Sequence, residues 1–504
     1  MNIEQLKNET HVEFLRQAAV LLFDSNLKLL DDLKRLRNQH SQSEQDRLAL
    51  EDTLHILRKK FFGDSSERSP RADRPVPTQS SLLIHNQVPE EIKDIVPLTT
   101  KALPEEPCEH HLDKQACVHC NSENIRPMKG QFEESTEVTV TERVYKKIIH
   151  KKQKYTCGDC GNITTAPGPD KLIPGLGYST DFVAQIAIDK FNFHLPLERQ
   201  CRQMESAGLV VGTRTLWGLT AVLADYLMPL TGKVRAEILT KSVVHMDESP
   251  MKILSTNTNG YVWVLSNNRG CYYRYETTRA GQVAREMLKD YEGTLLTDGY
   301  AAYNPLKKAI RAGPEIRRAF CWAHVRRKYF DAQDNQPEAV VGFELINDLY
   351  DIEHLAKDLA HLKELRNTES RKIIQKLRDW IDATQNQAFP NQALPTSSLG
   401  QAFSYTNSLW PGLTLFLNDE NIPLDNNSAE RALRSPVMGR NNYQGFRTID
   451  GADVAMTYFT LIDTCKILKL NPVHYIREMA HRAARREELL TPYEYAVGLK
   501  KQLK

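Results

Sequence analysis

Two stretches of apolar and β-branched residues each carry an aspartate at the point where the pattern breaks. Val-Val-His-Met leads into Asp247, and Thr-Leu-Leu-Thr leads into Asp298. Runs of this kind are typical of buried strands, bounded by the first polar residue. The pattern therefore predicts two buried strands that each end in a carboxylate.

The residues between these aspartates continue the regular patterning. Residues 260–276 have the alternation of a hairpin, residues 279–291 suit a helix, and residues 294–298 suit a strand. Three antiparallel strands, a helix and a parallel strand make a ribonuclease-H-like order, in which the first and fourth strands lie side by side. We therefore expect Asp247 and Asp298 to be close in space.

A third acidic residue stands near the start of a predicted helix. Asp425, Asn426, Asn427 and Ser428 all suit a helix N-cap, and Glu430 falls in the first turns of the helix that follows. Three such carboxylates can hold two divalent cations, which align the attacking and leaving oxygens of a phosphodiester. A single aspartate before a glycine is more often a turn residue, so the hypothesis depends on the ordered set.

Four sequence blocks around these acids resemble the insertion-sequence-66 family of bacterial DDE transposases: HMDESP, TDGYAAYN, CWAHVRRKYFDA and PLDNNSAERALRSPVMGRNNY. The resemblance covers nearly the whole chain. It implies that Asp247, Asp298 and Glu430 form a catalytic triad with two Mg²⁺ or Mn²⁺ ions per active site. The implied partners are double-stranded DNA, as terminal inverted repeats and target, together with accessory transposition proteins.

Helical periodicity also marks the amino-terminal part of the chain. Residues 13–62 suit a helix, with leucines at three- and four-residue spacing that is interrupted by polar residues in the middle. A coiled coil and a single amphipathic helix both fit, and the family resemblance favours a leucine-zipper-like segment in a homo-oligomer. Residues 64–107 are rich in proline and charge and suit a linker, although the pieces SLLIH and IKDIVPL are apolar enough to dock.

Two pairs of cysteines have the spacing of zinc knuckles. Cys117 and Cys120 form one CxxC pair, and Cys157 and Cys160 form the other. Four thiolates can close a tetrahedral structural zinc site, and alternating residues between the pairs suggest a hairpin that joins them. A redox role is the alternative for the pairs. Nearby residues could replace a thiolate ligand, although the four cysteines are preferred; they are Cys108, His110, His111 and His119. The basic residues of this segment, which suit either phosphate contacts or a solvated strand face, are Lys146, Lys147, Lys151, Lys152 and Lys154.

A helix-turn-helix pattern precedes the first aspartate. One helix is expected from about Leu197 to Ser206, Gly208 permits a turn, and Thr213 opens a second helix that offers Arg214 and Thr215 to DNA. Many short helix pairs share this pattern without binding DNA. The resemblance favours contacts to the terminal repeats.

Further polar residues flank the predicted catalytic segments. Cys321 and His324 are three residues apart and suit either a metal ligand pair or, preferably, a packing or hydrogen-bonding role beside the site. Basic residues that suit phosphate contacts follow both the Cys321/His324 pair and Glu430. They are Arg326, Arg327 and Lys328 after the pair, and Arg431 and Arg434 after Glu430. A turn is expected at residues 439–442, with Arg447 near DNA and a closing helix at residues 452–468.

Composition sets the remaining expectations. The chain has 504 residues, 41% hydrophobic and 26% charged, with a formal charge of +2, so that a DNA-binding surface requires segregated basic patches. No apolar run is long enough for a membrane span, and the amino terminus lacks a signal pattern. We expect a cytoplasmic, nucleoid-associated bacterial protein whose nine cysteines are free thiols or metal ligands.

These observations predict a multidomain α+β chain that functions as a DNA transposase, cutting insertion-sequence ends and transferring the strand to target DNA. A non-catalytic DNA-binding protein and a metal-dependent nuclease are the alternatives. The predicted segments are a leucine-zipper-like helix (1–63), a linker (64–107), a zinc-binding segment (108–170), a helix-turn-helix region (171–240), a ribonuclease-H-like catalytic domain (241–335 and 421–470), a helical insertion (336–420) and a C-terminal helical tail (471–504). Within the tail, residues 491–504 are expected to be peripheral.

Overall fold

The computed structural model describes residues 85, 87–89, 91–92, 143–156, 159–160, 162–289, 291–299, 303, 315–386 and 396–502, which all belong to one compact unit, Val76–Lys504. The predicted coiled coil lies outside the described residues, as does most of the linker. Within the linker, the His85 ring lies 2.8 Å from the Glu420 carbonyl oxygen, and Val88 and Ile92 are buried. A piece of the predicted linker therefore docks onto the folded unit.

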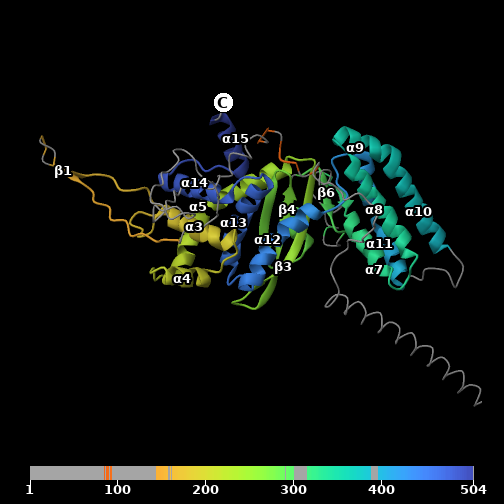
Figure 1. The fold of residues 1–504 in the computed structure, drawn as a ribbon, viewed down its shortest axis with the longest axis horizontal. Coiled ribbons are helices and arrows are strands. Elements are labelled where there is room, and N and C mark those ends of the chain that lie inside the picture. The colour runs from red at the N-terminus through yellow and green to blue at the C-terminus, as the bar shows by residue number, and fades with distance from the viewer. Residues whose placement is uncertain are drawn as a thin grey trace, which may run out of the picture. The chain divides into compact units, whose positions relative to one another are not determined.

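A mixed five-stranded sheet forms the centre of the fold, in the order β5-β4-β3-β6-β7 (Figure 1). The first three strands are antiparallel, and β6 and β7 continue the sheet parallel to β3. The first and fourth strands of this sheet are thus neighbours, as predicted, and the order is consistent with a ribonuclease-H-like domain. The strands are β3 (Val243–Ile253), β4 (Thr258–Asn267), β5 (Gly270–Glu276), β6 (Thr294–Thr297) and β7 (Arg317–Phe320).

The expected end of the first strand at Asp247 is wrong. Strand β3 continues to Ile253, because β4 pairs with it along its length, from His245 with Ser266 to Ile253 with Thr258. Pairing with β6 on the other edge ends at His245. Asp247 therefore lies where the parallel pairing stops, although its own strand goes on.

Helices cover the sheet and bury a large apolar core. Helix α12 contacts β3 and β4, whereas α13 packs against β5 and α5. Helix α13 carries few charged residues on any side, and most of its side chains are buried, as expected for a helix in the core. The helices of this part are α3 (Thr180–Phe191), α4 (Leu197–Ser206), α5 (Thr213–Leu239), α6 (Gly281–Met287), α12 (Asn427–Tyr443), α13 (Ile449–Ile467), α14 (Pro472–Arg485) and α15 (Pro492–Gln502).

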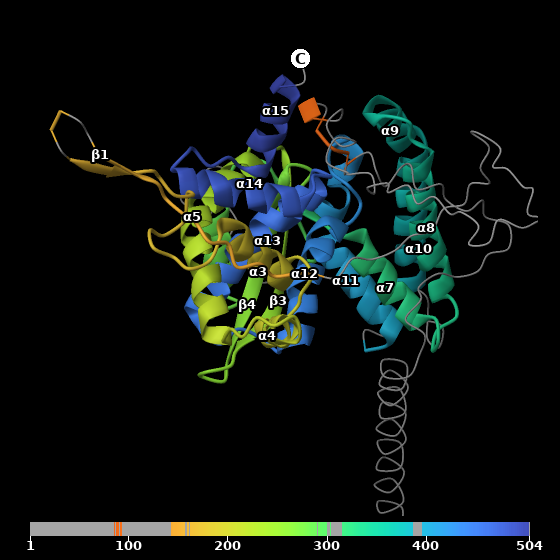
Figure 2. The same ribbon diagram turned by 60° about the vertical axis from the view of Figure 1, so that its left-hand side comes forward.

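A second apolar cluster joins β7 to the helices between β7 and α12. These helices, α7 to α11, lie together on one side of the sheet (Figures 1 and 2). At one end of this cluster, the buried Arg366 guanidinium pairs with Glu353 at 2.7 Å and donates to three carbonyl oxygens. These bonds compensate the cost of burying the charge. The elements are α7 (Trp322–Ala332), α8 (Ala339–Leu355), α9 (Leu359–Leu365), η3 (Arg366–Ser370), α10 (Arg371–Gln385), α11 (Ser398–Leu413) and η4 (Leu415–Asn418).

Two further expectations about the chain after Glu430 are wrong. Residues 439–442 are the last part of α12, and the chain turns instead at Gln444 and Gly445, which have φ values of 64° and 140°. Glycine adopts the second of these angles without the clash that a side chain would cause. The segment from residue 491 onward, expected to be peripheral, packs against the fold, because Thr491 and Ala496 are fully buried.

Two short strands lie near the amino-terminal end of the described residues. Strand β1 (Lys154–Thr156) pairs antiparallel with β2 (Ile163–Thr165), and the two flank the second cysteine pair. Among the described helices, none combines the length and the apolar character that crossing a bilayer requires.

Candidate functional site

Asp247 and Asp298 meet at the boundary between β3 and β6. His245 pairs with Leu296 in the parallel ladder, and each aspartate stands two residues beyond its member of that pair. Residues at equivalent positions on neighbouring strands project to the same face. The parallel register therefore brings the two carboxylates together, as the sequence predicted.

Glycine follows Asp298 in a left-handed conformation, and α11 lies against this part of the backbone. Gly299 has a φ of 87°, a conformation that side chains disfavour, and a Cβ atom at this position would approach Leu409. The Tyr405 hydroxyl donates to the Asp298 carbonyl oxygen at 2.5 Å. Glycine and tyrosine thus fix the backbone that carries the second carboxylate.

Glu430 lies in the first turn of α12, as predicted. Asn426 is the N-cap residue, but its side chain does not cap the helix. It donates to the Met246 carbonyl oxygen at 3.0 Å, and its amide oxygen lies 3.2 Å from Nδ1 of His245. Asn426 therefore attaches the start of α12 to β3 beside Asp247. This attachment sets the position of Glu430 relative to Asp247.

Electrostatics show that the three acids share one environment. Burial, as the largest cause, and the charges of Glu248, Asp298 and Glu430 together raise the pKa of Asp247 to about 8, against a hydrogen bond from the Glu248 backbone N–H that lowers it. Like charges in a partly buried site repel each other and disfavour ionisation. This donor set suits a divalent cation, which would relieve the repulsion.

Glu248 is a fourth acidic residue of the site, which sequence reasoning missed. Its buried carboxylate pairs with Arg279 at 2.7 Å and accepts a hydrogen bond from the Tyr303 hydroxyl. Burial raises its pKa, and both partners oppose that shift. Because Glu248 has these protein partners, it supports the site and is not available as a metal ligand in this arrangement. Its place next to Asp247 was the only sequence signal.

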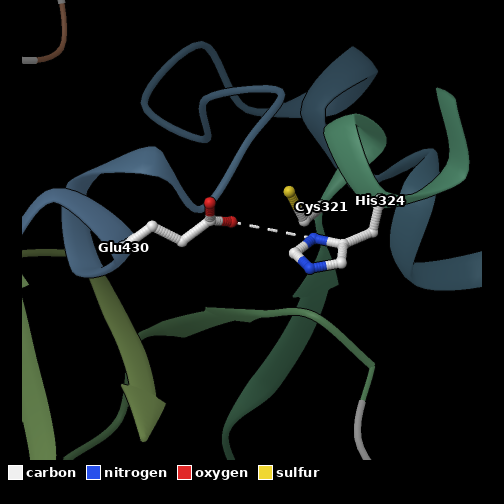
Figure 3. Close-up of side chains that lie close together, drawn as sticks. All are labelled: Cys321, His324 and Glu430. Carbon is white, nitrogen blue, oxygen red and sulfur yellow. Dashed lines mark ion pairs between the residues drawn. The ribbon is translucent and has the colours of Figure 1, made fainter. Parts of the chain in front are cut away.

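The CWAH block lies against the third acid. Cys321 precedes α7 and is buried, whereas His324 lies in the first turn of α7. Nδ1 of His324 lies 3.7 Å from Oε1 of Glu430, and ligand atoms of all three residues lie within 4.8 Å of one another (Figure 3). The Cys321 sulfur accepts a hydrogen bond from the Asn426 backbone N–H at 3.2 Å.

The basic residues predicted to contact DNA have different surroundings. Arg431 and Arg434 are exposed on α12 and line a hollow of about 500 Å³ together with Lys466 and His194. Arg326 instead donates to Asn347 at 2.9 Å. Its guanidinium also stacks over two rings, so it is less suited than the others to bind phosphate.

Four more predicted contact residues remain at the surface. Arg327 and Lys328 are exposed on α7. Arg214 and Thr215 are exposed at the start of α5, and the bounds of α4 and α5 agree with the helix pair expected from the sequence. These positions leave all four side chains accessible to a nucleic acid.

Among the four cysteines of the predicted zinc site, the structure describes Cys160. Cys117, Cys120 and Cys157 lie outside the described residues, and Cys160 is an exposed free cysteine. The zinc assignment therefore stays a prediction.

The chain has sequence relatives and matches a known protein family. The chain is 26% identical over 481 residues to the uncharacterized protein y4hP of Sinorhizobium fredii (strain NBRC 101917 / NGR234), covering 87% of this chain and 86% of the relative. It is 27% identical over 397 residues to the uncharacterized protein y4jD of the same strain, covering 73% and 75%. Residues 175–454, which include all three acids, match the family described as "Transposase IS66 family". The chain belongs to the IS66 family of transposases.

Proposed function

We propose that this protein is a DDE transposase that cuts DNA at the ends of an insertion sequence and joins the freed end to target DNA. The observation that carries the proposal is the convergence of Asp247, Asp298 and Glu430 from two parallel strands and a helix. Membership of the family supports transposition as the process. The three carboxylates are the proposed catalytic residues.

The carboxylates suit two Mg²⁺ or Mn²⁺ ions, because oxygen donors are the ligands that these cations prefer. When bound, such a pair aligns the attacking and leaving oxygens and neutralises charge that develops on the phosphate. Burial is the main cause that raises the pKa of Asp247, and the charges of Asp298 and Glu430 add to the shift; this crowding of carboxylates in a buried place is the observation in favour of the fit. Asp247, Asp298 and Glu430 would hold the ions.

The chain's own residues would orient the DNA and keep the acids in position. The Asn426 bonds hold the start of α12 against β3, and the Glu248–Arg279 pair ties β3 to the segment before α6, so the carboxylates need little rearrangement before they bind a substrate. Arg431 and Arg434 extend from the Glu430 helix and would bind backbone phosphates next to the cut, with Arg327 and Lys328 on α7. Water and then the freed 3′ hydroxyl would act as successive nucleophiles.

The remaining segments have proposed roles in DNA binding and assembly. Residues 241–335 and 421–470 would form a ribonuclease-H-like catalytic domain, with residues 336–420 as its helical insertion. Arg214 and Thr215 at the start of α5 would contact the terminal inverted repeats. Cys117, Cys120, Cys157 and Cys160 would hold a structural zinc ion. The leucine-zipper-like helix would pair copies of the chain, so that two DNA ends are held together.

A joining assay tests the proposal. The full chain, alone and with the proteins encoded beside its gene, is incubated with labelled duplexes that carry the inverted repeats flanking the gene, a target plasmid and Mg²⁺ or Mn²⁺. We expect cut ends and joined products, and an Asp298→Asn variant that binds the ends but yields roughly 10³-fold less of both. Cutting without joining on any duplex would indicate a nuclease. Binding without metal-dependent cutting would indicate a non-catalytic DNA-binding protein.

A further inference from the structure

Three side chains with metal-ligating atoms gather between α7 and α12. They are Cys321, His324 and Glu430, and the ligand atoms all lie within 4.8 Å of one another. Figure 3 shows the His324 ring and the Cys321 sulfur on the same side of the Glu430 carboxylate. Thiolate, imidazole and carboxylate differ from the all-oxygen set formed by the three acids.

Two atoms of this cluster lack the partners that buried polar atoms normally have. Nδ1 of His324 and Oε1 of Glu430 are buried and accept or donate no hydrogen bond among the described residues, although they lie 3.7 Å apart. Buried polar atoms are nearly always satisfied. Two ligands of one tetrahedral zinc ion lie roughly 3.4 Å apart, given bonds of about 2.1 Å. The observed separation is close to that value.

We propose that Cys321, His324 and Glu430 bind one Zn²⁺ ion. Sulfur, imidazole nitrogen and carboxylate oxygen are all zinc ligands, and three protein ligands leave a fourth position for water or a substrate oxygen. The Asn426 backbone N–H, which donates to the Cys321 sulfur at 3.2 Å, orients that ligand from outside the coordination sphere.

The second oxygen of Glu430 keeps this site compatible with the proposed catalytic one. In Figure 3 the ion pair with His324 uses one Glu430 oxygen, and the other oxygen lies off that line. The first oxygen can therefore bind zinc while the second is left for a catalytic cation. A zinc ion held there fixes the Glu430 carboxylate relative to α7.

Zinc content of the full chain tests the proposal without DNA or activity. Wild type, Cys321→Ala and His324→Ala are dialysed against zinc and then against zinc-free buffer, and bound metal is measured by mass spectrometry. Each variant should lose about one zinc ion per chain relative to wild type. Cys201→Ala and His481→Ala, which remove the same side-chain types outside the cluster, should lose none. Because zinc at the cysteine knuckles is common to all samples, the difference isolates this site.

Equal zinc content in wild type and in folded Cys321→Ala and His324→Ala variants would overturn the proposal and leave His324 as a polar neighbour of Glu430. Should the variants not fold, anomalous diffraction at the zinc edge from wild-type crystals decides. A peak between the three side chains supports the site, and the lack of one there overturns it. Neither result depends on DNA cleavage, so the role of Asp247 and Asp298 is tested separately.

Discussion

Asp247 and Asp298 stand two residues beyond the His245–Leu296 pair, at equivalent positions on adjacent parallel strands. No change of backbone conformation is needed to bring them together. The site is therefore built into the sheet, and Glu430 is added by a helix that Asn426 fastens to the same strand.

Divalent cations should stabilise the protein through these carboxylates. Millimolar Mn²⁺ should raise the melting temperature of the wild type by several degrees, because a ligand that binds the folded state shifts the unfolding equilibrium. Asp247→Asn should melt higher than wild type in chelator at pH 7, since the folded chain no longer has to protonate or bury the charge of a carboxyl whose pKa burial raises to about 8, and it should respond less to Mn²⁺. Scanning calorimetry measures both. Asp379→Asn, an exposed acid on α10, should behave as wild type. A full Mn²⁺ response in Asp247→Asn would contradict the assignment.

The Asn426 side chain should control catalysis through the position of α12. Asn426→Ala removes the bond to the Met246 carbonyl and leaves buried groups unpaired, so the free energy of unfolding should fall by about 1–3 kcal/mol. Cleavage should fall while the affinity for end DNA stays near that of the wild type. Denaturant titration and a binding assay separate the two effects. Asn421→Ala, at an exposed position before α12, is the matched control. Unchanged cleavage in a destabilised Asn426→Ala variant would refute the positioning role.

The three acids illustrate how much of the site the sequence predicts. Asp298 and Glu430 follow from local signals, namely the end of an apolar strand and the start of a helix that residues of N-cap type precede. Asp247 was identified by the same signal, but the continuation of β3 to Ile253 was missed, because that segment is polar on one side and is held by pairing with β4. Local patterning does not report which neighbour a strand has.

Contacts between segments far apart in the chain could not be predicted from local sequence patterns. Glu248 finds its partners, Arg279 and Tyr303, only through the tertiary fold. The approach of His324 to Glu430 likewise requires α7 and α12 to converge, which no periodicity encodes. Sequence patterns thus predicted the sheet order and the acids, whereas the surrounding bonds depend on long-range packing.

Arg431 and Arg434 should bind DNA phosphates. Replacing either with alanine should weaken binding of all duplexes and reduce the slope of log affinity against log salt by about 1, since each lost phosphate contact releases one counterion fewer. Fluorescence anisotropy between low and moderate salt measures this slope. Arg485→Ala, on α14, should leave the slope unchanged because Arg485 already pairs with Glu487 at 2.8 Å. An unaltered slope in both test variants would exclude these arginines from the DNA interface.

Lys190 should make stability depend on pH. Burial lowers its pKa from 10.5 to about 8, and its ammonium lies 4.5 Å from the centre of the Tyr443 ring. Between pH 8 and 10.5 the unfolded chain binds more protons at this residue than the folded chain, so its contribution to stability rises with pH. Lys190→Met should therefore raise the melting temperature by a few degrees at pH 7, and the gain should shrink toward pH 10.5. A gain that is constant across this range would contradict the pKa shift.

The most direct test of the shared-cation site is anomalous diffraction from crystals of the full chain grown with Mn²⁺. The predicted result is a manganese peak bounded by the carboxylates of Asp247, Asp298 and Glu430, which disappears in Asp298→Asn crystals. Manganese that binds elsewhere while these three carboxylates remain without metal would contradict the catalytic proposal.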